Sequence, residues 1–233
     1  MEIGSARAVV TGAASGLGLA VVRRVIAAGG SATLLDLQQD GGEAAARALG
    51  PAAHFIRCDV TDEAAVEAAV REGRQRMGGL TLAVACAGIG APGKLLGRDG
   101  PMSAAFFQRM LAVNVVGTFN LGRAAAALMQ HNAPDAGGER GVIVHTSSVA
   151  AWEGQVGQVA YSASKAAVVG MVLPMARELA RFGIRVMAIA PGLFATPMLA
   201  GLPQEVQDSL GAQGPFPPRP RRPQGFPGRR AAT

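Results

Sequence analysis

The sequence predicts an α/β fold, a doubly wound parallel sheet with helices on both of its faces. Two observations predict it. Short, continuous apolar runs alternate with longer helical patterns from the N-terminus onward, as they do where strands are buried on both faces. The 233 residues, 49% of them hydrophobic and 16% charged, also suit one domain with a large core. Right-handed crossovers between such strands give a Rossmann-like sheet.

Strands and helices are expected in strict alternation along the chain. The expected strands are the short apolar runs at 6–10, 32–36, 54–59, 80–86, 141–146 and 184–190. Helices are expected between them, at 16–28, 42–49, 63–77, 103–130 and 157–182. Asp62 is the expected N-cap of the third helix, and Pro191-Gly192 ends the last strand.

One catalytic domain is expected over residues 1–210, followed by an irregular tail rich in proline and arginine over 211–233. The tail has no helical or strand period, which predicts an extended or disordered segment. Five of the six net positive charges lie in the tail, on Arg219, Arg221, Arg222, Arg229 and Arg230. The folded body is therefore nearly neutral, and we expect no nucleic-acid partner. A basic tail that binds an acidic partner is the alternative.

Cysteine and histidine usage indicates no metal or redox site. Cys58 and Cys86 are far apart and fit no metal or redox spacing, which predicts two buried free thiols. The three histidines lie in different expected elements, so we expect no metal. The sequence has no signal-peptide pattern and no uninterrupted apolar run long enough for a membrane span, which favours a cytoplasmic protein without a membrane partner.

A glycine-rich stretch, Thr11-Gly12-Ala13-Ala14-Ser15-Gly16-Leu17-Gly18, joins the first expected strand to the first helix. Glycines let the chain turn tightly and bring its backbone close to a pyrophosphate. The helix N-terminus adds free N–H groups and a partial positive charge. This context favours a dinucleotide site over an ordinary turn.

Asp36 ends the second expected strand. A carboxylate there accepts hydrogen bonds from a ribose 2′-hydroxyl and repels a 2′-phosphate. Leu37 and Gln38 follow it, so no arginine is offered to NADP. We therefore expect NAD as the cofactor.

Tyr161 and Lys165 are the expected acid–base pair. Their i, i+4 spacing puts both on one face of a helix, and Tyr161 is the only tyrosine in the chain. A nearby ammonium favours the phenolate, so we expect Lys165 to lower the pKa of Tyr161. Such a pair can move a proton to or from an alcohol.

Two more polar positions accompany this pair. Ser147 and Ser148 follow the fifth expected strand, where open α/β sheets place groups that contact ligands. A serine hydroxyl there can hold a substrate oxygen. Asn114 stands between valines in a long expected helix, so its side chain needs a buried partner or a water.

Taken together, these motifs resemble the short-chain dehydrogenase/reductase family over about residues 6–200. The resemblance is carried, in order, by T-G-x-x-x-G-x-G, Asp59-Val60, Cys86-Ala87-Gly88, Asn114-Val115-Val116-Gly117, Ser148, Tyr161-x-x-x-Lys165 and Pro191-Gly192. Residues 137–143, 148–158 and 190–197 resemble the 3-hydroxyacyl-CoA dehydrogenase type 2 branch, also described as a hydroxysteroid dehydrogenase. The resemblance implies fatty acid metabolism, with NAD-dependent oxidation of 3-hydroxyacyl-CoA thioesters or of secondary alcohols in steroids.

The resemblance also implies a role for each matched residue. Four are catalytic: Tyr161 as proton donor or acceptor, Lys165 on the nicotinamide ribose, Ser148 on the substrate oxygen, and Asn114 holding a water. The implied cofactor contacts are Gly12, Ser15, Gly16, Leu17, Gly18, Asp36, Asp59, Val60, Cys86, Ala87, Gly88, Tyr161, Lys165, Pro191, Gly192 and Thr196. The implied substrate contacts are Ser148, Tyr161 and Gln155, although a surface-loop glutamine explains Gln155 nearly as well.

The chain departs from the family pattern at its C-terminal end. Related chains continue past the sixth strand with another helix and a seventh strand, whereas here the match decays after about Gln213. We therefore expect a sheet that lacks its usual last strand, with unpaired backbone and exposed apolar surface. The family otherwise implies a homo-oligomer, a tetramer or a dimer.

Three alternatives to a 3-hydroxyacyl-CoA dehydrogenase follow. The first keeps the chemistry with another substrate, a hydroxysteroid or a 3-oxoacyl carrier protein. The second is a non-catalytic NAD-binding protein disabled by its altered end. The third is a nucleic-acid-binding module that uses the basic tail.

Overall fold

The computed structural model describes residues 2–98, 100–201, 204, 207 and 220–226. Its main sheet has six strands in the order β3-β2-β1-β4-β7-β8, all paired in parallel. The strands are β1 (Arg7–Thr11), β2 (Ser31–Asp36), β3 (Ala53–Arg57), β4 (Leu82–Ala85), β7 (Gly141–Thr146) and β8 (Ile184–Ile189). This is the doubly wound order of a dinucleotide-binding sheet, so the predicted fold class is confirmed.

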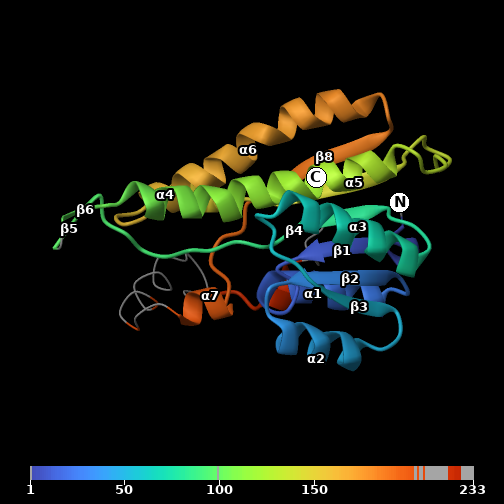
Figure 1. Cartoon of the computed structure of the whole chain (residues 1–233), viewed down its shortest axis with the longest axis horizontal. Coiled ribbons are helices and arrows are strands. Elements are labelled where there is room, and N and C mark those ends of the chain that lie inside the picture. The colour runs from blue at the N-terminus through green and yellow to red at the C-terminus, as the bar shows by residue number, and fades with distance from the viewer. Residues whose placement is uncertain (1, 99, 202–203, 205–206, 208–219, 227–233) are drawn as a thin grey trace.

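Helices cover both faces of the sheet (Figure 1). One face is covered by α3 (Glu63–Met77), α5 (Gly117–Met129) and α6 (Val159–Ala180). The other is covered by α1 (Gly16–Ala27) and α2 (Gln39–Leu49). Successive strand residues point to opposite faces, so Val9 belongs to the first core and Val10 to the second.

The long expected helix at 103–130 is not continuous. It consists of α4 (Ala104–Leu111), a π-helical turn (Ala112–Val116) and α5. The π-helical turn contains Asn114, and such turns are found often at functional sites. A short hairpin that we did not expect, β5 (Leu96–Gly97) with β6 (Gly100–Pro101), precedes α4.

Helix α2 begins three residues before the predicted start. The predicted start was Gly42, and this glycine lies inside the helix, where it packs directly under Phe55 of β3. A methyl group on Gly42 would stand 2.0 Å from Cε2 of that ring. Tertiary packing therefore overrides the low helix propensity of glycine here.

Two helical stretches are long and apolar enough to cross a membrane by length and composition, Ala104–Met129 and Val159–Ala180. The expectation that no apolar segment reaches this length is therefore not met. Both stretches pack on the sheet and bury polar side chains, among them Asn114 and Lys165. A core helix of a globular domain passes the same test, and the absence of a membrane partner stays a prediction.

Part of the C-terminal tail is folded onto the domain, which differs from the extended or disordered tail that we expected. Residues 220–226, which we call the return segment, form a parallel bridge from Arg221 to Phe194 and a turn of 3₁₀ helix at Pro223–Gly225. Phe226 is 5% exposed and belongs to the core under α1. The rest of the predicted tail, 211–219 and 227–233, lies outside the described residues.

Candidate active site

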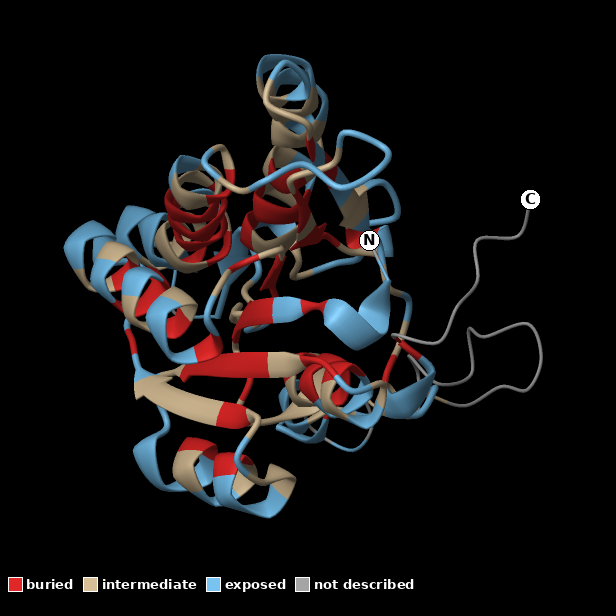
Figure 2. Cartoon of the chain, turned by 90° about the vertical axis from the view of Figure 1, so that its right-hand side faces the viewer, coloured by how far each residue is buried: buried red, intermediate tan, exposed pale blue. Residues whose placement is uncertain are grey.

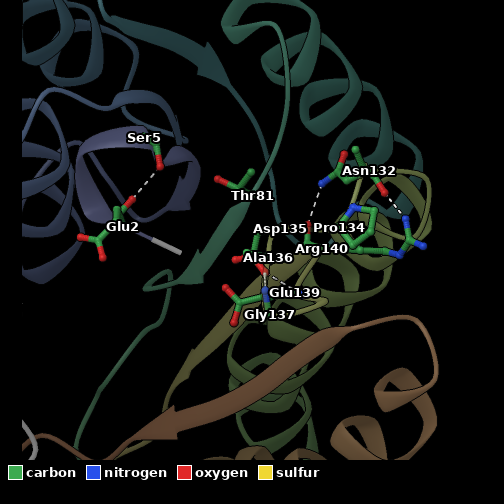
Figure 3. A pocket seen from close by; sticks show the side chains of 12 residues that line it. Glu2, Ser5, Thr81, Asn132, Pro134, Asp135, Ala136, Gly137, Glu139 and Arg140 are labelled. Atoms are coloured by element: carbon green, nitrogen blue, oxygen red, sulfur yellow. Dashed lines mark hydrogen bonds between the residues drawn. The ribbon is translucent and has the colours of Figure 1, made fainter.

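The candidate residues come from distant parts of the sequence but follow the carboxyl ends of β1, β2, β3, β4, β7 and β8. Because the strands are parallel, these ends share one edge of the sheet, the usual ligand edge of an open α/β fold. A pocket of about 450 Å³ lies elsewhere, where Thr81 and Gly141 lead into β4 and β7 (Figure 3). Asn132 closes a loop beside this pocket by donating to the carbonyls of Leu80 (2.7 Å) and Arg140 (2.8 Å).

The glycine loop forms a cradle that side chains would fill. Gly12 and Gly16 have φ angles of 62° and 55°, the left-handed region that favours glycine. A methyl group on Gly12 would stand 2.7 Å from the backbone of Ala87, and one on Gly18 would stand 2.3 Å from the Gly12 carbonyl oxygen. The chain therefore packs backbone against backbone, which leaves the loop open toward a ligand.

Helix α1 begins at the end of this cradle. The side chain of its N-cap residue, Ser15, makes no capping hydrogen bond. The Ser15 carbonyl accepts a hydrogen bond from the Leu19 N–H (3.0 Å). The first turn therefore presents N–H groups without helical partners. Together with the helix dipole, these groups suit the phosphates of a dinucleotide.

Asp36 stands beside the cradle at the end of β2. Its Oδ2 accepts a hydrogen bond from the Ala14 N–H (3.0 Å) and its Oδ1 accepts one from the Gln38 N–H (3.1 Å). The carboxylate is thus held next to the glycine loop, at the place where a ribose 2′-hydroxyl is bound in this fold.

Two further loops border the same space. In the loop after β3, Asp59 is exposed and its Oδ1 accepts from the N–H (2.9 Å) and hydroxyl (2.8 Å) of Thr61. Val60 is 7% exposed and packs against Gly117. In the loop after β4, Ala87 donates its N–H to Thr11 Oγ1 (3.2 Å), which ties this loop to β1.

The two cysteines are free thiols, as the sequence predicts. Cys58 is buried and Cys86 is partly buried, with its Sγ 3.6 Å from Thr146 Oγ1. Burial raises the pKa of each thiol to about 11. Both are therefore protonated at neutral pH and act as packing groups.

Lys165 is buried at the centre of the site, with 6% of its surface exposed. Its ammonium donates to the Thr146 carbonyl (2.9 Å) and lies 5.7 Å from the centroid of the Tyr161 ring. Burial lowers the pKa of Lys165 from 10.5 to about 8. A methyl group on Gly88 would stand 3.7 Å from Nζ, so this glycine lets the loop after β4 pass close to the ammonium.

The expected lowering of the Tyr161 pKa is wrong for this structure. Burial raises the pKa of the phenol above its ordinary value of 10.0, and the hydrogen bond with Ser148 acts in the opposite direction with less effect. The phenolate loses its hydration, while the Lys165 ammonium is bound to a carbonyl rather than to the phenol.

The two serines after β7 have separate positions. Ser147 is 2% exposed and donates its hydroxyl to the Lys165 carbonyl (2.9 Å), which ties α6 to the sheet. Ser148 is partly exposed, and its hydroxyl contacts Tyr161 and accepts from the Ala150 N–H (3.2 Å). Ser148 is therefore the serine that faces the site, in agreement with the position assigned from the motif.

Asn114 has the buried partners that the sequence required. It is fully buried, and its amide exchanges two hydrogen bonds with the backbone of Ile89, at 2.8 and 3.0 Å. Its Nδ2 also donates to Ser164 Oγ (3.0 Å), and Ser164 donates to the Tyr161 carbonyl (2.7 Å). Ser164 thus links Asn114 to the helix that carries Tyr161, a link that sequence reasoning missed.

The segment after β8 closes the site from the other side. Thr196 stands against the glycine loop, where a methyl group on Gly16 would be 3.6 Å from Thr196 Cγ2. Thr196 also caps the short helix α7 (Pro197–Ala200). Gly90 lies between Met198 and Tyr161: a methyl group added to it would stand 3.1 Å from Met198 Sδ and 3.6 Å from Tyr161 Cε2. No sequence signal pointed to Met198.

Gln155 lies in the exposed loop after Ser148, and its N–H donates to Gln158 Oε1 (3.0 Å). Its contact with substrate stays a prediction. The same loop exposes two apolar side chains that the sequence reading did not single out, Trp152 (66% exposed) and Val156 (88% exposed). Among the described residues, no cluster of His, Cys, Asp and Glu has the size needed to hold a metal ion.

These groups can bind a dinucleotide and transfer a proton beside it, which defines a class of nicotinamide-dependent oxidoreductases. The chain belongs to the short chain dehydrogenase family, whose model matches residues 6–207. The family typically uses NAD or NADP, and the protein is accordingly an oxidoreductase that acts on a small molecule.

Within this family, the chain is similar to several proteins named 3-hydroxyacyl-CoA dehydrogenase type-2. The 3-hydroxyacyl-CoA dehydrogenase type-2 of Homo sapiens is 53% identical over 214 residues, which cover 91% of this chain and 82% of the relative. Its counterpart in Bos taurus is 51% identical over the same spans. A crystal structure of 3-hydroxyacyl-CoA dehydrogenase type-2 from Mycobacterium avium has a TM-score of 0.89 at 38% identity and covers 97% of this chain and 88% of that chain.

Proposed function

We propose that this protein is an NAD-dependent oxidoreductase that interconverts the secondary alcohol of a 3-hydroxyacyl-CoA thioester and the corresponding ketone. The observation that carries the proposal is the cluster of Tyr161, Ser148 and the buried Lys165 beside a glycine cradle. The names of the similar proteins support the substrate class. The reaction would serve the oxidation of fatty acyl chains.

The described residues fit a bound dinucleotide. The Gly12–Gly18 loop and the start of α1 would hold the pyrophosphate, and the Asp36 carboxylate would accept from the adenosine ribose. A 2′-phosphate would be repelled at Asp36, which supports NAD over NADP. When bound, the nicotinamide ring supplies or accepts the hydride, and the protein supplies geometry.

Tyr161 would donate a proton to the ketone oxygen during reduction and accept it from the alcohol during oxidation. The Ser148 hydroxyl would hold the same oxygen by a hydrogen bond. Lys165, with a pKa of about 8, is largely protonated at neutral pH. A cation so close to the ring favours the phenolate that forms when Tyr161 gives up its proton. Asn114 and Ser164 would fix the helix that carries the pair.

The loop after Ser148 supports an acyl substrate. Trp152 and Val156 present apolar surface to solvent within a few residues of Ser148. Such surface suits an acyl chain whose oxidised carbon lies at Tyr161. Gln155, between them in sequence, would contact the polar part of the same substrate.

The first test is NADH oxidation with acetoacetyl-CoA, with Tyr161→Phe as the variant. We expect turnover in the unaltered protein and a loss of kcat on the order of 10²–10⁴-fold in the variant, the usual range for a general acid. NADPH should support much slower turnover because of Asp36.

NADH binding, followed by fluorescence, is the control for a folded variant. Equal turnover in the Tyr161→Phe variant would contradict the assigned role. Binding of NADH without turnover of acetoacetyl-CoA, of a hydroxysteroid or of a 3-oxoacyl carrier protein would favour a non-catalytic NAD-binding protein.

We also propose a cytoplasmic homo-oligomer, a dimer or a tetramer. Exposed apolar side chains on α5 and α6 support assembly, namely Phe119 (43% exposed), Val159 (47%) and Leu173 (56%). Sedimentation of the purified protein would measure its mass. A monomer at micromolar concentration would contradict the proposal.

A further inference from the structure

The return segment lies along the stretch that leads from β8 into the site (Figure 1). The Arg221 N–H donates to the Leu193 carbonyl (2.9 Å), and the Ala195 N–H donates to the Arg221 carbonyl (2.8 Å). Both bonds are between main-chain groups, as in a parallel sheet. The stretch 193–195 is therefore held by a segment more than twenty residues away in sequence.

Phe226 anchors the return segment in the core. It is 5% exposed, and its ring packs edge-to-face on Phe194 (8% exposed), with the centroids 5.9 Å apart and the planes at 87°. Both rings belong to the apolar cluster between α1 and the sheet. The other residues of the return segment are intermediate or exposed, and Figure 2 colours the backbone by the same burial classes. The Pro223–Gly225 turn also packs on α1, the helix that begins at the glycine cradle.

The stretch held in this way continues directly into the site. Thr196 follows Ala195, stands against Gly16 and caps α7. Met198 of α7 then lies on the far side of Gly90 from Tyr161. A displacement of Phe194 would therefore move groups that border both the cradle and the acid–base pair.

We propose that the return segment is a positioning element for the cofactor site, with Phe226 as its anchor and the Arg221 main chain as its link. The inference rests on the proposed function, in that the bound molecule is a nicotinamide dinucleotide. Holding 193–196 in place before binding removes an ordering step that would otherwise weaken affinity. Phe226 lies in the core and acts through Phe194, not by contact with a reacting group.

The test uses the full-length chain and two variants with different mechanisms. Phe226→Ala removes the anchor, and Arg221→Pro removes one main-chain donor. Arg221→Ala is the matched control, because the Arg221 side chain is exposed and its main-chain bonds persist. We expect Phe226→Ala and Arg221→Pro each to raise the NADH dissociation constant about tenfold. The dissociation constant of the Arg221→Ala control should stay within about twofold of that of the unaltered chain. At saturating NADH, kcat should change little.

A second readout separates positioning from core stability. Because coupling is reciprocal, NADH should slow hydrogen exchange at the Ala195 and Arg221 amides in the unaltered chain. Unchanged exchange at these amides, or unchanged NADH affinity in a folded Arg221→Pro variant, would overturn the proposal even if Phe226→Ala fails to fold. Failure of the unaltered chain to bind NADH would overturn the proposed function itself.

Discussion

The β1–β2 side of the sheet and the β8 edge bury their strands to different extents. In β1 only Arg7 is exposed, and in β2 the four central residues are buried. In β8 burial alternates, with Ile184 and Val186 in the core and Arg185, Met187 and Ile189 exposed. Helices α1 and α2 cover the second face near β1 and β2, whereas the described residues of the apolar cluster on that face include none from β8. The burial of a strand thus depends on the helices that cover its faces as much as on its own residues.

The largest effect on stability is expected when a buried side chain of β2 is truncated, and truncation of a side chain in β8 gives the direct comparison. Leu35→Ala in β2 removes a fully buried side chain from the first core. We expect the free energy of unfolding to fall by about 2–5 kcal/mol, because transfer and cavity terms add. Ile189→Ala in β8 removes a side chain that is 39% exposed and should cost under about 1.5 kcal/mol. Urea denaturation measures both values. Equal losses would mean that the β8 edge is covered in solution.

His145 of β7 lies at the border between the two regions. It is fully buried, and burial lowers its pKa from 6.5 to about 4. The unfolded chain binds the proton first, so stability should fall as the pH drops from about 6.5 through 4. The difference between the pKa values of His145 in the unfolded and folded chains corresponds to a loss of about 3 kcal/mol in the free energy of unfolding. In the same urea series, His145→Leu should remove this part of the slope. A slope unchanged in the variant would assign the effect to other groups.

The smallest expected effect is at the exposed face of β8. Met187 is 37% exposed, so Met187→Ser should change the free energy of unfolding by no more than about 0.5 kcal/mol. The variant should also bind less of a hydrophobic dye, because it removes apolar surface. A loss of stability above about 2 kcal/mol, measured by thermal unfolding, would show that another surface covers this face.

Agreement between sequence and structure is best where the controlling interactions are local. The positions of Gly12, Gly16 and Gly18 could be read from the sequence, because backbone conformation and close approach demand glycine there. The i, i+4 spacing of Tyr161 and Lys165 likewise fixed their common face. The choice of Ser148 over Ser147 came from motif position, and the structure places the two hydroxyls accordingly.

What the sequence by itself determined is the parallel α/β order, the glycine cradle and the common helix face of Tyr161 and Lys165, since each depends on periodicity or spacing within a short segment. Only the tertiary structure decided the partners of Asn114, the raised pKa of Tyr161 and the place of Phe226. Each of these depends on which groups from distant segments meet, and on how much water they exclude. Neither the contacts between distant segments nor the exclusion of water can be predicted from a local sequence pattern.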